Sequence, residues 1–317
     1  MSKIGFIFPG QASQYAGMGR ELAEKFPTAH RAFEEADRAL GFQISKLCFE
    51  GPDEELQLTM NTQPAILTVS IAAYRVLEEK GLLPDAVAGH SLGEYSALVA
   101  AGALRLGDAV QVVRKRGMYM QEAVPLGQGA MAAIVGLPLD CIYQICADAR
   151  LDEECSAANI NSPSQIVIAG SRDAVERAVK LATEAGAKRA IPLNVSAPFH
   201  CRLMMPAQER LEHDLMRMDF DDLRFPLVTN VDAEYISTGL AARTSLVRQV
   251  CSPVLWEDCI HAMIDRGIDT FVEVGPGRVL SSLVKQIDRS RRILNVEDEK
   301  SLAATMEALR DAVRTDH

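Results

Sequence analysis

The sequence lacks the features that mark membrane, secreted and nucleic-acid-binding proteins. No stretch of its 317 residues approaches the ~20 consecutive apolar residues of a membrane-spanning helix, and the apolar run near the start is far too short for a secretory signal. No block of basic residues offsets the formal net charge of −10, as binding a nucleic acid would require. We therefore expect a cytoplasmic protein without a membrane or nucleic-acid partner.

Paired cysteines and internal repeats are also missing. The seven cysteines are an odd number and include no Cys-x-x-Cys pair, so the sequence signals neither a disulfide framework nor a zinc site. We expect no metal and no cofactor. We expect reduced cysteines, most of them in the core, at Cys48, Cys141, Cys146, Cys155, Cys201, Cys251 and Cys259.

Apolar residues are plentiful, and they form alternating strand and helix patterns. They make up 48% of the chain, which is ample for a buried core. The alternation predicts an α/β fold whose mostly parallel sheet is covered on both faces. Its expected strands are 3–8, 85–89, 226–231 and 270–276, and its expected helices are 21–40, 65–81, 93–104, 106–121, 206–218 and 244–267, followed by two more helices.

The middle of the chain follows a different order of elements. Strands at 130–137, 156–162, 165–171 and 187–195 alternate with helices at 140–150 and 173–186 in the order β-α-β-β-α-β. This order is typical of a ferredoxin-like unit. We therefore expect a small ferredoxin-like subdomain at residues 124–198, inserted into a discontinuous larger domain of residues 1–123 and 199–317.

The stretch "AVAGHSLGEYSALVAAGAL", residues 86–104, places Ser91 in a Gly-x-Ser-x-Gly pattern. A nucleophilic serine is exposed when it sits on a sharp strand-to-helix turn, and such a turn requires glycines two residues before and after it. Gly89 and Gly93 meet this requirement, with an expected strand before them and a helix after. A plain loop serine is the alternative, which this context disfavours.

Serine needs a general base, and His200 is the best candidate among six histidines. It lies where the chain returns from the inserted unit, although a packing role at the domain border explains its position equally well. His90 adjoins Ser91, so its side chain should diverge from that of the serine and pack or orient instead. The other four are expected at or near the surface: His30, His213, His261 and His317.

An arginine on the expected helix 106–121 points inward. At about 100° per residue, Arg116 lies about 60° from the centre of the apolar stripe, whereas Lys115 falls on the opposite face. A buried guanidinium needs a carboxylate partner. Glu94 or Glu122 could supply it, and so could the free acid of a substrate; helical geometry does not choose between them.

Two main-chain N–H groups are candidates for stabilising an oxyanion. One belongs to Leu92, the residue after the serine, and the other to Gln11 in the glycine-rich loop after the first strand. This loop also fits a simple helix N-terminal turn, which is compatible with that role.

Together these residues resemble the malonyl-CoA:acyl carrier protein transacylases over nearly the whole chain. The resemblance rests on Arg116, 25 residues after Ser91, and on "FPGQ" at 8–11, "GHSLGEYSAL" at 89–98, "NSPSQIVIAG" at 161–170, "FH" at 199–200 and "EVGPG" at 273–277. It implies a hydrolase-like catalytic domain and a ping-pong transfer of malonyl from CoA, through an ester on Ser91, to the phosphopantetheine thiol of acyl carrier protein.

The resemblance also implies roles for single residues. His200 assists Ser91 and is oriented by the main-chain carbonyl of Gln249, so no third acid is needed. Arg116 pairs with the malonyl carboxylate, and Gln11 and Leu92 provide the oxyanion hole. The bulk of Phe199 favours malonyl over methylmalonyl as a preference. Ala12 departs from the glycine of many relatives, and we expect no loss of the oxyanion donors.

The partners are harder to predict from the sequence. Acyl carrier protein is acidic, so a local basic patch should meet it, and candidates are Lys188 and Arg189, Arg114 and Lys115, or Lys285, Arg289, Arg291 and Arg292. A chain with no attached ketosynthase favours fatty-acid synthesis and a monomer. A serine thioesterase or a trans-acting acyltransferase of a polyketide pathway remain the alternatives.

Overall fold

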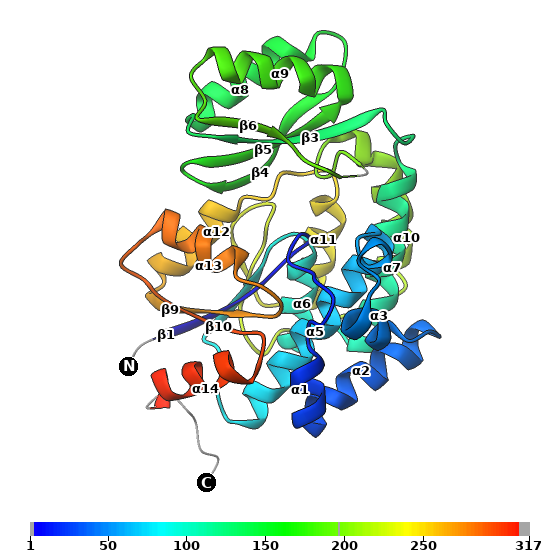
Figure 1. Ribbon diagram of the computed structural model, residues 1–317, viewed down its shortest axis with the longest axis vertical. Helices are drawn as coiled ribbons and strands as arrows, with labels where there is room; N and C mark the ends of the chain where they lie inside the picture. The colour runs from blue at the N-terminus through cyan, green and yellow to red at the C-terminus, as the bar shows by residue number, and fades with distance from the viewer. Residues whose placement is uncertain (1–2, 196, 311–317) are drawn as a thin grey trace.

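The computed structural model describes residues 3–195 and 197–310. Its strands form two separate sheets, a six-stranded sheet A and a four-stranded sheet B, with sheet B and its two helices at the top of Figure 1. This agrees with the predicted α/β class. Every site residue discussed below comes from sheet A, its connections, or the segments that join the two sheets.

Sheet A has the strand order β10-β9-β1-β2-β7-β8, and all its pairs are parallel except β7 with the edge strand β8. Successive side chains of β1 point to opposite faces, so Phe6 and Phe8 join one apolar cluster and Ile7 joins another. The strands are β1 (Lys3–Phe8), β2 (Ala86–Gly89), β7 (Leu227–Val228), β8 (Tyr235–Ile236), β9 (Ile268–Val274) and β10 (Arg292–Val296).

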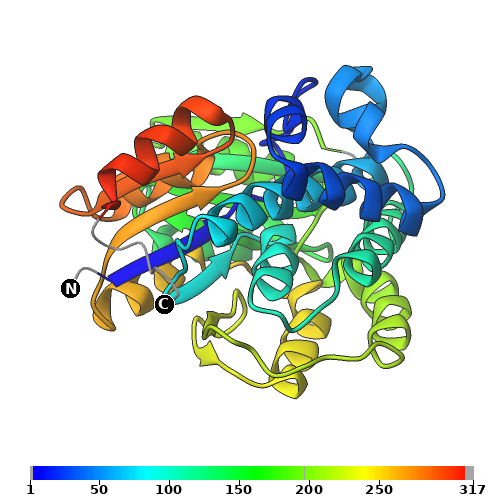
Figure 2. The ribbon, with the colours of Figure 1, turned by 90° about the horizontal axis from the view of Figure 1, so that it is seen from below.

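Helices cover both faces of sheet A, as Figures 1 and 2 show. One face packs against α12 (Trp256–Asp265) and α13 (Val279–Ile287). The opposite face packs against a larger group: α1 (Arg20–Lys25), α2 (Pro27–Leu40), α3 (Ile44–Glu50), α4 (Asp53–Leu56), α5 (Thr59–Glu79), α6 (Leu92–Ala100), α7 (Leu106–Glu122), α10 (Met205–Leu215), α11 (Gly239–Gln249) and α14 (Glu299–Ala308).

Sheet B is wholly antiparallel, with the order β4-β5-β3-β6. One of its faces packs under two helices in a separate apolar cluster, and the other contributes Met131, Ala133 and Val167 to the large cluster of the main body. Sheet B therefore covers one end of sheet A. Its elements are β3 (Gly129–Val135), α8 (Leu139–Arg150), β4 (Cys155–Ser162), β5 (Gln165–Ser171), α9 (Arg172–Glu184) and β6 (Arg189–Pro192).

Three predicted helices have the wrong bounds. The helix expected at 21–40 is two helices that meet at Phe26, and the helix expected at 244–267 is α11 and α12. In the second case Val254 pairs with sheet B: its N–H donates to Ala158 O, and its carbonyl accepts from Ile160 N. A continuous helix through Val254 would have prevented this pairing. The helix expected from Ala65 begins at Thr59, with Pro64 inside it.

The sequence patterns also missed several short elements. These are the helices α3 and α4, the edge strand β8, and β10, which lies between the last two helices at the other edge of sheet A. All seven cysteines are free; five are buried and two are half-buried, as expected for most of them. Among residues 3–195 and 197–310, no helix has the length and apolarity needed to cross a membrane.

Candidate active site

Ser91 lies at the end of β2, immediately before α6, on a strained turn. Its backbone has φ 51° and ψ −104°, a conformation that non-glycine residues rarely adopt and that persists where the surroundings enforce it. A Cβ on Gly89 would overlap the main chain of Gly93, and a Cβ on Gly93 would overlap the carbonyl of Phe8. The two glycines therefore allow the strand, the turn and the helix to pack in direct contact.

The turn brings Ser91 into contact with His200. The Ser91 Oγ and His200 Nε2 atoms are 2.7 Å apart, and His200 Nδ1 is 2.9 Å from the main-chain oxygen of Gln249. Because a carbonyl only accepts, Nδ1 carries the ring proton and donates it to Gln249, which leaves Nε2 to accept from the Ser91 hydroxyl. His200 is itself strained, with φ 60°, and is buried. The pair has the geometry of a nucleophile and its general base.

His200 is uncharged at neutral pH. Burial and, after it, the positive charge of Arg116 lower the pKa of His200 to about 3, while the hydrogen bond to Gln249 acts in the opposite direction. A neutral imidazole is the form that accepts a proton. The serine therefore faces a base in the required protonation state.

Arg116 lies on α7 and is 2% exposed, so the prediction that it points inward is confirmed. Its Nη1 donates to Gln63 Oε1 at 2.8 Å, and its Nη2 donates to Gln249 Oε1 at 3.0 Å and to Ser91 Oγ at 3.1 Å. A Cβ on Gly117 would lie 2.7 Å from the Thr59 oxygen, so this glycine lets α7 approach α5 closely and brings the guanidinium to Gln63.

Neither carboxylate considered as a partner of Arg116 forms an ion pair with it. Glu122 pairs with Arg210 on the surface, at 2.6 Å. Glu94 is buried and accepts instead from Asn230, Ser245 and Gln249. Within residues 3–195 and 197–310, the hydrogen-bond acceptors of Arg116 are all uncharged. A buried guanidinium beside the serine is thus available to the carboxylate of a ligand.

The loop after β1 lies against the serine turn. The His90 N–H donates to Phe8 O at 3.0 Å, and a Cβ on Gly10 would touch the His90 carbonyl. This places Gln11 beside the turn, while Leu92 begins α6. No hydrogen bond of the main-chain N–H of Gln11 or Leu92 is found in the described part of the chain. Both donors are therefore available to an oxyanion.

Ala12, next to Gln11 in this loop, adopts a φ of 82°. That is a left-handed conformation in which an alanine is strained. The Ala12 N–H donates to Gln14 Oε1 at 2.8 Å, and the Ser13 hydroxyl donates to the Gly10 carbonyl at 2.7 Å. These contacts within the loop hold the strained residue in place next to Gln11.

Four of the five remaining histidines lie in the described part of the chain, and these are where they were expected. His90 Nε2 is 2.8 Å from Asn161 Oδ1 of sheet B, and its ring lies 5.5 Å from that of Trp256, so His90 packs and links the two sheets. His30, His213 and His261 are exposed. His317 lies outside the described residues. No group of three metal-ligating side chains occurs in residues 3–195 and 197–310.

Phe199 is 8% exposed and belongs to the same apolar cluster as Met131, Ala133 and Val167 of sheet B. It directly precedes His200 in the sequence, and its burial holds the ring in a fixed position. That its bulk limits the size of the acyl group stays a prediction.

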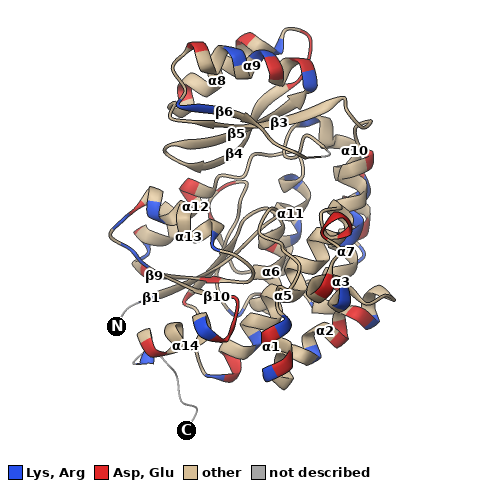
Figure 3. Ribbon diagram, viewed as in Figure 1, with Lys and Arg blue, Asp and Glu red and all other residues tan. Residues whose placement is uncertain are grey.

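The candidate basic patches differ in how many of their charges are already paired. Lys115 donates to Asp214, Arg291 pairs with Asp288, and the guanidinium of Arg114 stacks 4.7 Å from the ring centre of Phe42. Figure 3 shows basic and acidic segments interspersed along the outer helices. Exposed members of the patches are Lys115, Lys188, Arg189, Lys285, Arg289 and Arg292.

Two site residues were missed by the sequence analysis. Asn230 follows β7, and its Oδ1 accepts from the Ser91 N–H at 2.7 Å. Its position after a parallel strand was a usable signal, because ligand sites gather at the carboxyl ends of such strands. Gln63 had no such signal: it precedes a proline that is typical of a helix start, and the helix in fact begins four residues earlier.

Comparisons with known proteins give a consistent result. The family described as "Acyl transferase domain" matches residues 5–314. The malonyl CoA-acyl carrier protein transacylase of Bacillus subtilis (strain 168) is 49% identical over 314 residues, which cover 98% of each chain. The crystal structure of an acyl carrier protein S-malonyltransferase from Vibrio cholerae superposes with a TM-score of 0.94 at 46% identity, covering 96% of this chain and 100% of that one.

A further solved structure contains a carrier protein. It is described as a type II PKS acyl-carrier protein in complex with its malonyl-transacylase, and it superposes with a TM-score of 0.95 at 44% identity, covering 97% of this chain and 100% of that one.

Proposed function

Because the chain belongs to the malonyl CoA-acyl carrier protein transacylases of the acyl transferase family, we propose that it transfers malonyl from malonyl-CoA to the phosphopantetheine thiol of acyl carrier protein. One observation carries the proposal. A serine hydrogen-bonds both to a neutral histidine and to a buried arginine whose acceptors are uncharged. This arrangement suits an acyl group with a free carboxylate at its far end.

In the first half of the reaction, Ser91 Oγ attacks the thioester carbonyl of malonyl-CoA, and its proton passes to His200 Nε2. The main-chain N–H groups of Gln11 and Leu92 donate to the oxyanion that forms. The carbon–sulfur bond then breaks, and His200 returns the proton to the sulfur of CoA. The product is a malonyl ester on Ser91.

The second half runs the same steps in reverse with a different thiol. The phosphopantetheine thiol gives its proton to His200, and its sulfur attacks the ester carbonyl. The carbon–oxygen bond breaks, and the proton returns to Ser91 Oγ. Because CoA leaves before the carrier protein binds, the kinetics are ping-pong.

Arg116 makes the acyl pocket selective for a carboxylate. Two of its N–H groups can hold the malonyl carboxylate in place of uncharged partners. That carboxylate also offsets the charge that lowers the pKa of His200, so the histidine becomes a stronger base when the correct substrate is bound. Phe199 and Leu92 limit room for an added methyl, a preference of about 1–3 kcal/mol.

The cellular role follows from the chemistry of the substrates. Malonyl groups on carrier proteins are the building blocks of fatty-acid and type II polyketide synthesis. We assign the chain to fatty-acid synthesis, in the cytoplasm, as a monomer without a cofactor. We assign the binding of the acidic carrier protein to the exposed basic residues, among them Arg189 of β6 in sheet B and the adjacent Lys188.

We also propose the domain division expected from the sequence. Residues 124–198 form a ferredoxin-like subdomain inserted into a discontinuous hydrolase-like domain of residues 1–123 and 199–317. The strand order β4-β5-β3-β6, the antiparallel pairing and the separate apolar cluster support this division.

Intact-protein mass spectrometry after mixing with malonyl-CoA tests the proposed function. We expect a stable adduct of one malonyl unit that is absent from Ser91→Ala and much reduced in Arg116→Ala. A serine thioesterase, built on the same turn, would instead release free malonate rapidly without an adduct, and that outcome would refute the transferase.

A further inference from the structure

Glu94 is a fully buried carboxyl group that none of the steps above uses. It lies in the first turn of α6, three residues after Ser91, and its own N–H donates to the Ser91 carbonyl at 3.1 Å. A buried ionisable side chain is costly unless its oxygens are satisfied by donors. The identity of these donors indicates what Glu94 does.

Three donors, all from beyond β7 in the sequence, converge on the Glu94 carboxylate. Its Oε2 accepts from the Asn230 N–H at 3.0 Å and from Gln249 Nε2 at 2.9 Å, and its Oε1 accepts from the Ser245 hydroxyl at 3.2 Å. Two of these residues, Asn230 and Gln249, also contact the reacting side chains or their main chain. Glu94 thus acts on the site through two intermediaries.

Gln249 connects Glu94 to both the base and the arginine. Its main-chain oxygen accepts from His200, and its side-chain oxygen accepts from Arg116 Nη2. Because a carboxylate only accepts, Glu94 requires the NH₂ end of the Gln249 amide to face it. The carbonyl end must then face the guanidinium. The NH₂ end also donates to the Ser91 carbonyl at 3.0 Å, so the Glu94 carboxylate, that carbonyl and the guanidinium together hold the amide in one orientation.

Asn230 connects Glu94 to the nucleophile. Its Oδ1 accepts from the Ser91 N–H, and its Nδ2 donates to the Gly89 carbonyl at 2.7 Å, so the side chain spans the strained turn. The Asn230 main chain is held by the carboxylate of Glu94. The strain at Ser91 persists only while these contacts hold the turn from both sides.

We propose that Glu94 is a positioning residue, whose carboxylate fixes the Gln249 amide and Asn230 and through them aligns Arg116 for a substrate carboxylate and Ser91 for attack. The part that concerns Arg116 rests on the proposed function. The part that concerns Ser91 and His200 does not, because it applies to any reaction of this serine.

The surroundings of Glu94 shift its pKa into a range where its protonation can be followed by experiment. Arg116 on α7 is the positive charge facing it, Tyr95 on α6 and Cys259 on α12 are its other titratable neighbours, and the facing groups of α11 are uncharged. Burial raises the pKa of Glu94 to about 7, against the effect of its donors and of Arg116. His200, with a pKa lowered to about 3, stays neutral in this range.

Two measurements test the two parts of the proposal separately. A fluorophosphonate probe labels a reactive serine without any acyl-CoA, so the pH dependence of its labelling rate reports on Ser91 and His200. The ratio of kcat/KM for malonyl-CoA to that for acetyl-CoA reports on the alignment of Arg116, since the acetyl group lacks the free carboxylate that Arg116 would bind. The variants are Glu94→Gln, which cannot ionise, and Glu94→Asp, which can.

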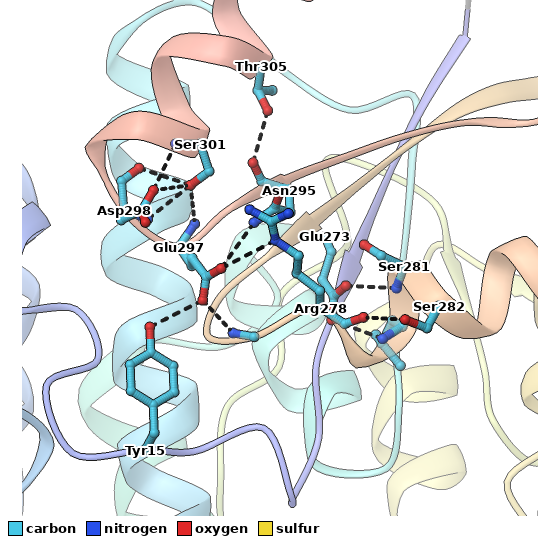
Figure 4. A network of polar contacts seen from close by, with 12 residues as sticks. Tyr15, Glu273, Arg278, Ser281, Ser282, Asn295, Glu297, Asp298, Ser301 and Thr305 are labelled. Atoms are coloured by element: carbon cyan, nitrogen blue, oxygen red, sulfur yellow. Dashed lines mark hydrogen bonds and ion pairs between the residues drawn. The ribbon is translucent and has the colours of Figure 1, made fainter.

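The matched control is Glu273→Gln. Glu273 is also fully buried, and burial raises its pKa to about 7, but its oxygens accept from Leu280 N and Ser281 N at the start of α13 (Figure 4). It makes no contact with Ser91, His200, Arg116 or Gln249. This variant removes a buried carboxylate of the same kind from outside the site.

We expect the labelling of wild-type Ser91 to slow as the pH falls through about 7, because protonated Glu94 no longer fixes the two intermediaries. Glu94→Gln should label about tenfold more slowly at pH 8, with no step near pH 7, and should lose about tenfold in malonyl over acetyl preference. The labelling rate of Glu94→Asp should again depend on pH, with its midpoint at a pH different from that of the wild type. Glu273→Gln should label as the wild type does.

A step near pH 7 that is unchanged in Glu94→Gln, together with an unchanged substrate preference, would overturn the proposal. If circular dichroism shows that Glu94→Gln does not fold, Glu94→Asp provides the test. A labelling rate of Glu94→Asp that changes at the same pH as that of the wild type would then overturn the proposal. Wild-type protein that fails to transfer malonyl would refute the proposed function alone, because the labelling of Ser91 still decides the role of Glu94.

Discussion

Single residues determine whether the serine turn can form at all. Gly89 and Gly93 lie against each other's main chain, and Gly93 lies against Phe8, with no space for a methyl group. Gly89→Ala should therefore destabilise the fold by several kcal/mol or prevent folding. Urea unfolding followed by circular dichroism measures the change.

The control for this prediction is Gly107→Ala. Gly107 lies in α7, and a Cβ there would make only an ordinary 3.5 Å contact with Ala39. Alanine favours a helix by up to about 1 kcal/mol over glycine, so this variant should be as stable as the wild type or more so. Equal effects of the two substitutions would contradict the account of the turn.

The proposed preference for a malonyl group also depends on one residue, Arg116. Arg116→Ala should lower kcat/KM for malonyl-CoA by about a hundredfold or more, because two charge-assisted hydrogen bonds are lost, and should leave the much slower reaction of acetyl-CoA nearly unchanged. Arg210→Ala, which removes an exposed guanidinium paired with Glu122, serves as the control. Parallel losses with both acyl groups would show that Arg116 is structural.

The sequence predicts the residues of this site that follow a motif or a periodicity. Ser91 was identified from its glycines, and the inward position of Arg116 from helical geometry alone. The links between them, Gln63 and Asn230, were not found, because neither belongs to a short pattern and each reaches the site by a tertiary contact. For Glu94 the burial was foreseeable, but its partners were not.

At the scale of elements, the last helix is held by its N-terminal cap. The Asp298 side chain accepts from the Ser301 N–H at 2.7 Å, and the Ser301 hydroxyl lies 3.1 Å from the Asp298 N–H, which together make a capping box (Figure 4). Just before it, Glu297 accepts from the Tyr15 hydroxyl and from the Gly277 N–H, so the same corner anchors the loop that carries Gln11.

Asp298→Ala should lower the free energy of unfolding by about 1 kcal/mol, the typical contribution of such a cap. The exposed Lys300→Ala is the control and should change it by less than about 0.5 kcal/mol. Chemical denaturation of the three proteins compares them directly. An Asp298→Ala protein as stable as its control would show that the box contributes nothing measurable.

Element boundaries were predicted least well, for identifiable reasons. The apolar pattern across residues 244–267 continues through Pro253, yet tertiary pairing of Val254 with sheet B interrupts the helix. The helix expected from Ala65 begins at Thr59 instead, where its first turn packs closely against Gly117 of α7. Both errors reflect contacts between segments far apart in the sequence, which local patterns do not contain.

At the scale of the whole molecule, the buried carboxyls make stability depend on pH. The pKa of Glu94 and of Glu273 is raised from 4.5 to about 7 by burial, so the folded state holds their protons more tightly than the unfolded state. Their contribution is fully favourable below pH 4.5 and is lost as the pH rises to about 7. Each of these two groups should therefore remove on the order of 2–3 kcal/mol of stability between pH 5 and pH 8, whereas the buried His200 and His90, whose pKa values are lowered, add stability as the pH rises to about 6.5.

Urea unfolding at the two pH values checks this, with Glu273→Gln as the comparison. The variant keeps the contributions of Glu94 and of the histidines and loses that of Glu273, so relative to the wild type it should become more stable as the pH rises from 5 to 8. Equal changes in the two proteins would contradict the raised pKa of Glu273.

The overall architecture was the most predictable feature, since it depends on patterns repeated along the chain. Alternating strands and helices predicted the parallel sheet, and the β-α-β-β-α-β order predicted the elements of sheet B. The way sheet B covers the site was not predictable, because it rests on apolar contacts such as those of Met131 and Val167 with the main body.

The central claim is that Ser91 carries an acyl group to a thiol, and one single-turnover measurement tests it most directly. The protein is charged with malonyl-CoA, freed of CoA by gel filtration, and mixed either with phosphopantetheinylated acyl carrier protein or with buffer. The account predicts that the malonyl unit moves within seconds to the carrier protein and stays on Ser91 in buffer. Loss of the malonyl unit to water at the same rate in both mixtures would contradict it.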